Sequence, residues 1–267
     1  MTTLFSYKLF DTGLAPNFSG DLMTLGCCKP AVRKAAKSGD WVVGLAHQTV
    51  KKINGITEPQ PFVIYIMQVS ETISWQEYDL RVQKDPKLSM KIPNNTSPET
   101  RCGDAIYSFN KQGIPKQRIG LHLPYDVQRD VYDGRNVLLA KRFWYFGNKM
   151  IPLPKDLWGL NVAQGMKSKI NEPLLKVFRT WVDSLDYKPG VHGEMSIKAK
   201  SLTYPDSVDS VVSAWRNNQR DPQLLQYISR LKKQQSENDS NSPISKKNKR
   251  DDVKLPAYNK KRLRVKL

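Results

Sequence analysis

Cysteine is scarce in this chain, and its placement excludes two common uses of the residue. Only three of the 267 residues are cysteines, and two of them, Cys27 and Cys28, are neighbours. An odd count without a CxxC spacing fits neither the disulfide framework of a small secreted protein nor the usual zinc motifs. We therefore expect reduced thiols in a cytoplasmic protein, with no bound metal and no cofactor.

Long apolar runs are also missing. The longest lies near residues 62–69, which is far shorter than the ~20 residues that a membrane-spanning helix needs. The N-terminal residues read as a short strand followed by Asp11, which does not fit a signal peptide. The sequence thus predicts an intracellular protein that does not span a membrane.

Acidic residues are too few to balance the basic ones. The chain carries 43 Lys and Arg against 25 Asp and Glu, a net charge of +18, and residues 231–267 alone carry 12 against 4. Such an excess attracts polyanions, of which DNA and RNA are the first candidates and an anionic membrane surface the next. Residues 1–230 carry an excess of basic residues as well, so the tail does not account for the whole net charge.

Common catalytic motifs are absent, because no P-loop, GxGxxG, GxSxG or HExxH pattern occurs. No histidine has a partner at metal-ligand spacing. Turn formation explains the acidic residues near glycines as well as acid/base chemistry does. Nothing therefore demands an enzyme, but an enzyme would draw its acid/base groups from Asp11, Asp40, Asp104 and His122.

Hydrophobic periodicity divides the chain into a strand-rich part, residues 1–150, and a helix-rich part, residues 151–230. This segregation predicts an α+β domain over residues 1–230, followed by a disordered basic tail over residues 231–267. The expected strands lie near residues 4–10, 41–46, 60–70, 102–109 and 136–147, and the expected helices near 30–37, 74–82, 174–185, 208–215 and 221–231. For the helix near 174–185, Asn171 is the expected N-cap.

Aromatic residues gather where a base could stack. Trp41 follows a Gly-Asp turn, and an aromatic run covers residues 143–146. Strand alternation predicts Phe143 and Tyr145 on one face and Trp144 on the other. These residues either fill a sheet core or line a base-binding site, and the sequence leaves both readings open.

Lys29 and Arg33 are spaced to share one face of a short helix, where they would suit a nucleotide phosphate. Gly39 permits a tight reversal that would bring Asp40 and Trp41 beside that helix. The sequence therefore predicts a pocket in which the cations hold a phosphate, Asp40 accepts from a base and Trp41 stacks on it.

Four segments together resemble a known family: DTGLAPN at residues 11–17, LGCCKPAVRKAAKSGDWVVG at 25–44, GDAIY at 103–107 and FWYFGNKMIPLP at 143–154. They resemble the nucleotide modification associated domain family, type 2, which occurs in bacteria and phages near genes for modified DNA bases. The resemblance implies a protein that recognises or handles such bases. The helix–GDWVVG–strand unit is also similar to part of PUA-like domains, which implies a mixed β-barrel or sheet core with packed helices.

Three readings remain open. The first is a binding module for modified bases, the second an enzyme of base or nucleotide modification, and the third a generic RNA- or ribosome-associated protein; oligomeric state is not indicated. DNA is favoured over RNA as partner. The candidate base- or nucleotide-binding residues are Asp11, Asn17, Cys28, Lys29, Arg33, Asp40, Trp41, Asp104, Tyr107, His122, Trp144 and Tyr145. The candidate phosphate-binding residues of the tail are Lys246, Lys247, Lys249, Arg250, Lys260, Lys261, Arg262 and Arg264.

A chain that ends at Arg230 should fold normally, bind DNA less tightly and show a shallower dependence of affinity on salt. The two basic clusters of the tail would contact phosphates and release counterions, and truncation removes that contribution. Fluorescence anisotropy with a DNA duplex at several salt concentrations measures both quantities. An unchanged salt slope would show that the tail is not the anchor.

Overall fold

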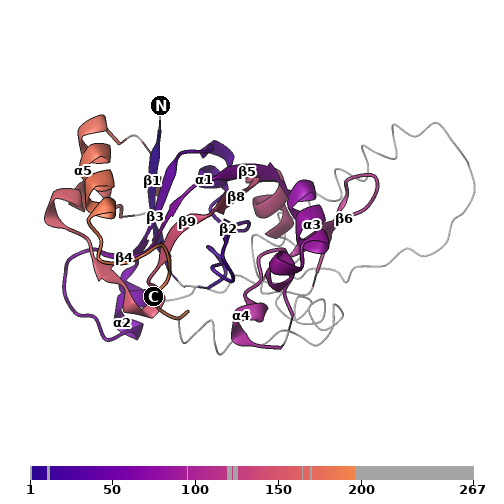
Figure 1. Cartoon of the computed structure of the whole chain (residues 1–267), viewed down its shortest axis with the longest axis horizontal. Helices are drawn as coiled ribbons and strands as arrows, with labels where there is room; N and C mark the ends of the chain where they lie inside the picture. The colour runs from indigo at the N-terminus through magenta and orange to yellow at the C-terminus, as the bar shows by residue number, and fades with distance from the viewer. Residues whose placement is uncertain are drawn as a thin grey trace, which may run out of the picture. The chain divides into compact units, whose positions relative to one another are not determined.

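The β-branched and aromatic runs pair with one another in one seven-stranded sheet, shown in the computed structural model of Figure 1. Along the sheet the strands are β11 (Met166–Lys167), β1 (Leu4–Leu9), β3 (Trp41–Ala46), β4 (Phe62–Gln68), β9 (Arg142–Tyr145) and β12 (Gly190–Val191), and β10 (Ile151–Pro152) also pairs with β4. The β1–β3 and β9–β12 pairs are parallel, and the others are antiparallel.

The structure describes residues 2–10, 13–94, 96–118, 122, 126–163, 165–168 and 170–195. The basic tail and the helices expected near residues 208–215 and 221–231 lie outside these ranges. So do Asp11 and the predicted domain boundary at residue 230.

Two smaller sheets lie beside the main one. The first has the order β2 (Met23–Leu25), β8 (Asn136–Ala140), β5 (Glu71–Ser74), and the second pairs β6 (Tyr107–Phe109) with β7 (Pro115–Gln117). The α+β class is therefore as predicted, but the sheets do not form the closed barrel that a PUA-like core implies. Within the described residues the main sheet ends in two-residue strands, β11 and β12, each paired with one neighbour, so its edges do not join.

The helices are short apart from two. They are α1 (Pro30–Ala35), α2 (Gln48–Ile53), α3 (Trp75–Lys84), α4 (Pro98–Arg101), α5 (Glu172–Asp183), the 3-10 helices η1 (Pro86–Lys91), η3 (Gly147–Lys149) and η4 (Lys155–Leu160), and the π-helix η2 (Gln128–Asp133). The cap predicted for α5 is confirmed, because the Asn171 side chain accepts from the Leu174 amide. Among the described helices, none has the length and apolar character to cross a membrane.

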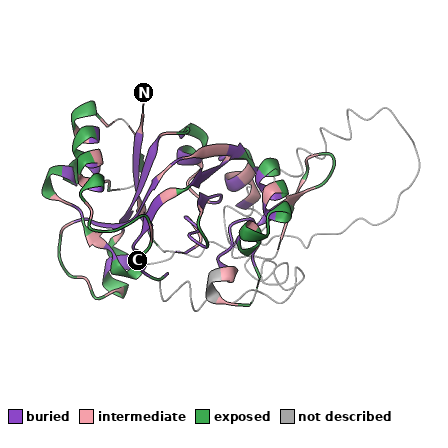
Figure 2. Ribbon diagram, viewed as in Figure 1, coloured by how far each residue is buried: buried purple, intermediate pink, exposed green. Residues whose placement is uncertain are grey.

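Both faces of the main sheet are covered, as Figure 2 shows by the buried strands at its centre. Phe143 and Tyr145 belong to one core cluster and Trp144 to the other, which confirms the predicted alternation. On the Trp144 face, α5 and η4 supply the covering side chains, and Phe178 packs edge-on against Trp41. A third cluster fills the space between the β2–β8–β5 sheet and α3.

The turn between α1 and β3 is held by one buried carboxylate. Asp40 is 4% exposed, and it accepts from the Thr3 amide at 2.7 Å and from the Lys37 amide at 2.8 Å. Gly39 takes the left-handed conformation that the reversal requires, with φ of 88°. Both oxygens of Asp40 are thus committed to the backbone, and Trp41 beside it lies in the core, so neither is placed to contact a base.

Replacing Asp40 by alanine should lower the free energy of unfolding by about 3 kcal/mol, because two buried amides lose a charged acceptor. For a domain of this size that loss corresponds to a melting temperature lower by roughly 10 °C. Thermal unfolding followed by circular dichroism measures the shift. Asp156→Ala, which removes an exposed carboxylate, is the control, and equal shifts in the two variants would contradict the role given to Asp40.

Candidate active site

Cys28 lies in the short connection between β2 and α1, in a conformation that few side chains adopt. Its φ is 56°, and that of Lys29 is 42°, so two successive residues are left-handed. The Cys28 amide donates to Asp130 Oδ1 at 2.7 Å, and the Cys28 carbonyl accepts from Arg33 Nε at 2.6 Å. Both polar backbone atoms of Cys28 are therefore held in place.

His122 connects this cysteine to a buried carboxylate. Its Nε2 lies 3.5 Å from Cys28 Sγ, and its Nδ1 lies 2.6 Å from Asp130 Oδ2. Cys28 is half-buried, whereas Asp130 is fully buried. The order of thiol, imidazole and carboxylate is the one in which a nucleophile faces a base that a third group orients.

Strand pairing explains how residues so far apart in sequence meet. Cys28 closely follows β2, and Asp130 closely precedes β8. The two strands are antiparallel, with Leu25 opposite Leu138. Since the end of one antiparallel strand lies beside the start of the other, the pairing places Cys28 next to Asp130.

Arg33 is a buried clamp and not the phosphate ligand that the sequence suggests. It is 0% exposed, and its Nη1 donates to the carbonyls of Asp130 and Asn136, both at 2.8 Å. Its Nη2 lies 3.6 Å from Asp130 Oδ1. A Cβ atom at Gly134 would lie 2.2 Å from this guanidinium, so the close approach requires glycine there.

The Cys28 row, which consists of Cys28, His122 and Asp130, contains groups that shift one another's pKa values. A hydrogen bond from Cys27 lowers the pKa of the Cys28 thiol well below its ordinary value, against the effect of burial, and His122 adds to the lowering. Burial acts to lower the pKa of His122, but its hydrogen bonds to Asp130 and Cys28 outweigh that and raise it to about 10. Burial opposes ionisation of Asp130, yet the hydrogen bond from His122 lowers the pKa of this carboxyl. The site therefore favours a thiolate–imidazolium pair.

Two further cations stand beside the thiolate. Arg129 Nε donates to Asp130 Oδ1 at 3.0 Å, and its Nη1 is 2.9 Å from Asp126. Lys29 is half-buried, donates to the Lys8 carbonyl at 3.0 Å and lies 4.5 Å from the centre of the Tyr7 ring. The charge of Arg129 adds to the lowering of the Cys28 pKa.

Three soft donor atoms converge here. The sulfurs of Cys27 and Cys28 and a ring nitrogen of His122 all lie within 4.8 Å of one another. The sequence alone gives His122 no metal-ligating partner, because the cysteines are more than ninety residues away along the chain. The fold supplies those partners, with Cys27 buried and Cys28 half-buried.

Other predicted site residues make hydrogen bonds that stabilise the fold. Asp104 is fully buried and accepts from Thr24, Tyr78 and the Gly26 amide. The Asn17 amide donates to the Cys102 carbonyl at 2.7 Å. The Asp104 contacts hold β2 and the residue that follows it, Gly26, in place.

The aromatic candidates separate into two groups. Trp144 is 2% exposed and donates to the Tyr187 carbonyl, and Tyr145 is buried and stacked on Phe18 with ring centres 3.9 Å apart. With Trp41, they are core residues. Tyr107 alone reaches the row, because its hydroxyl donates to Asp130 at 3.3 Å.

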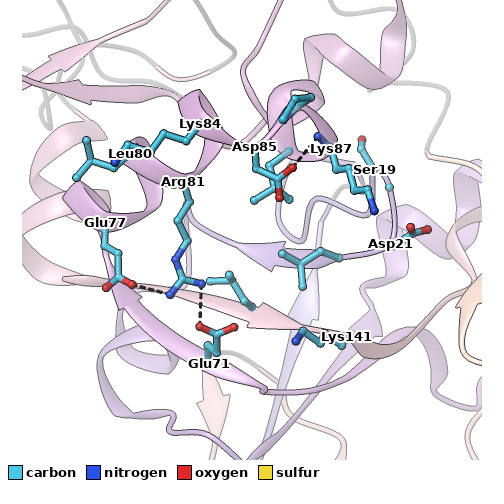
Figure 3. Close-up of a pocket in the computed structure, with 15 residues that line it drawn as sticks. Ser19, Asp21, Glu71, Glu77, Leu80, Arg81, Lys84, Asp85, Lys87 and Lys141 are labelled. Carbon is cyan, nitrogen blue, oxygen red and sulfur yellow. Dashed lines mark hydrogen bonds and ion pairs between the residues drawn. The ribbon is translucent and has the colours of Figure 1, made fainter.

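A separate groove of about 1220 Å³ lies over β5, α3 and η1 (Figure 3). Arg81 crosses it and pairs with Glu71 at 2.8 Å and Glu77 at 2.6 Å. Four acidic and four basic side chains line it, and none of the predicted site residues is among them. The groove is balanced in charge and lacks the thiol and imidazole chemistry of the Cys28 row.

The comparisons with known proteins assign the chain to a family. The model of a family described as nucleotide modification associated domain 2 matches residues 1–200. The chain belongs to that family. Searches among curated proteins and solved structures found no significant match.

Membership in the nucleotide modification associated domain 2 family confirms the resemblance seen in the sequence. The match contains Cys28, His122 and Asp130, whereas the basic clusters of the tail lie beyond it. The family name connects the chain with nucleotide modification and does not distinguish a reader of bases from an enzyme. That distinction has to come from the residues themselves.

Four residues that the sequence suggests, Cys28, Lys29, Tyr107 and His122, lie in this candidate site. The sequence suggests neither Asp130 nor Arg129. The one local signal is an Arg-Asp pair shortly after His122, in DVQRDVYDG. A carboxylate eight positions from a histidine has no special meaning on a strand or helix, so only the folded loop shows the pairing.

Native protein should react with iodoacetamide first at Cys28, while the buried Cys27 and Cys102 react only after denaturation. Because His122 supports the thiolate, His122→Ala should slow alkylation of Cys28 by ~10-fold or more. Peptide mapping by mass spectrometry follows each cysteine separately. Equal rates for the three cysteines in native protein would contradict the site.

Proposed function

We propose that this protein is a cysteine-dependent acyl-transfer enzyme that acts on nucleotides or nucleic acid bases carrying an acyl or amide group. The observation that carries the proposal is the row of Cys28 Sγ, His122 Nε2 and Nδ1, and Asp130 Oδ2, with separations of 3.5 and 2.6 Å. This arrangement differs from the binding module that the sequence favours.

The three groups have distinct roles in such a reaction. Cys28 attacks the carbonyl carbon, and His122 gives its Nε2 proton to the departing amine or alcohol as the bond to it breaks. In the second half, water or an acceptor amine attacks the thioester while His122 takes its proton, and the Cys28 thiolate leaves. Asp130 keeps the imidazole oriented through Nδ1 in both halves.

Two other observations support the proposed substrate class. The family name ties the domain to nucleotide modification, and a net charge of +18 favours a polyanionic substrate. Lys29 and Arg129 add positive potential next to the thiol. We therefore place the acyl group on a base or nucleotide and not on a protein, with DNA favoured over RNA.

A binding-only role is the second candidate, supported by the same net charge. Base readers use exposed aromatic faces and edge-directed hydrogen bonds. The aromatic residues predicted for that purpose, Trp41, Trp144 and Tyr145, are instead in the core. Convergence of a thiol, an imidazole and a carboxylate is what an enzyme needs and a reader does not.

The protein should release acyl groups from oligodeoxynucleotides that contain N4-acetylcytosine or N6-acetyladenine, through a thioester at Cys28. Cys28→Ser should slow release by ~10³-fold or more, and His122→Ala by a similar factor, because each removes a group that acts in the bond-breaking step. Liquid chromatography of the digested oligonucleotide measures release, and intact-mass spectrometry of rapidly quenched protein detects the acyl-enzyme.

Cys102→Ala is the matched control, since this cysteine is buried away from the row and should leave the rate unchanged. Circular dichroism establishes that each variant is folded. Release that persists in Cys28→Ser would overturn the proposal, and so would the lack of any reaction in wild-type protein whose Cys28 is shown to be alkylated rapidly.

A further inference from the structure

Cys27 enters the proposed reaction only indirectly, as a hydrogen-bonding neighbour of Cys28. Cys27 is fully buried, burial raises the pKa of its thiol, and the carbonyl of Leu14 is a weak acceptor for it at 3.8 Å. Its sulfur nevertheless points into the same small volume as Cys28 Sγ and the His122 ring. A buried thiol placed next to a second thiol and an imidazole has the composition of a metal site.

We propose that Cys27, Cys28 and His122 together bind one soft divalent cation, Zn²⁺ or its equivalent, and that this ion caps the Cys28 thiol. Binding of the metal rests on the geometry alone. The consequence that metal-loaded protein is inactive rests on the acyl-transfer function proposed above.

The distances suit a tetrahedral ion. Zinc binds sulfur at ~2.3 Å and imidazole nitrogen at ~2.0–2.1 Å, so neighbouring donor atoms in a tetrahedral site lie roughly 3.5–3.8 Å apart. Cys28 Sγ and His122 Nε2 are already 3.5 Å apart, and all three donor atoms lie within 4.8 Å of one another. Three protein ligands leave the fourth position to water or to a ligand.

The surroundings of the cluster also suit a metal ion. Metal-bound histidine commonly donates its other ring nitrogen to a carboxylate, and Asp130 Oδ2 already accepts from His122 Nδ1 at 2.6 Å.

A Cys27 variant distinguishes metal binding from acyl transfer. As a metal ligand Cys27 is required for binding, whereas the acyl-transfer reaction gives it no step. Cys27→Ser should therefore bind Zn²⁺ more weakly than wild type by ~100-fold or more, since even the loss of a second-shell partner costs ~10–100-fold. Because the serine hydroxyl can still donate to Cys28 Sγ, the same variant should still be alkylated rapidly at Cys28.

The test is titration of chelator-treated full-length protein with Zn²⁺ against a chromophoric competitor. Wild type and Cys102→Ala should bind one equivalent tightly, and His122→Ala should lose affinity as Cys27→Ser does. One equivalent of Zn²⁺ should also abolish alkylation of Cys28 in wild type, and a chelator should restore it. Circular dichroism verifies the fold of each variant.

Cobalt(II) gives a readout that needs no variant. Wild-type protein with one equivalent of Co²⁺ should show intense visible bands of a tetrahedral ion and a near-ultraviolet thiolate charge-transfer band. A weak octahedral spectrum, or equal Zn²⁺ affinity in wild type and Cys27→Ser, would overturn the metal site. Tight binding that leaves alkylation of Cys28 unchanged would overturn the capping. Failure of the acyl-transfer assay with a tetrahedral cobalt spectrum would refute only the function.

Discussion

A carboxylate without access to water determines the local structure around the proposed nucleophile. Asp130 is fully buried, and it accepts from the Cys28 amide, the His122 ring and Arg129. A charge in such a place is tolerated only when its lone pairs are satisfied by donors and its charge is compensated. The groups that satisfy Asp130 are the same ones that position and ionise the Cys28 thiol, so stability and reactivity depend on a single set of contacts.

The main sheet and the β2–β8–β5 sheet have different roles. The main sheet packs large side chains on both faces, including the tryptophans and tyrosines that read as base-stacking residues. The candidate site lies instead at the end of the β2–β8–β5 sheet, where loops from different parts of the chain meet. This separation lets the buried sheet supply rigidity while short connections carry the reactive groups.

The sequence predicts those parts of the fold that depend on local residue patterns. The strands of the main sheet follow from β-branched runs, and α5 follows from its apolar stripe and the Asn171 cap. The phosphate-binding role that the sequence predicts for Arg33 is wrong, because the i, i+4 rule indicates a shared helix face but not whether that face is buried. The pairing of His122 with Asp130 and Cys28 depends on long-range strand pairing, which leaves no periodic trace in the sequence.

The β2–β8 pairing implies unequal tolerance to changes in chain length. Cys28 stands three residues beyond β2, and Asp130 stands six residues before β8. A one-residue insertion in either connector would rotate or shift one partner of the row, whereas the intervening hundred residues can lengthen at their surface loops without altering the strand register. We therefore expect an added residue to be tolerated better in the surface loops between the two strands than in either of these two connectors.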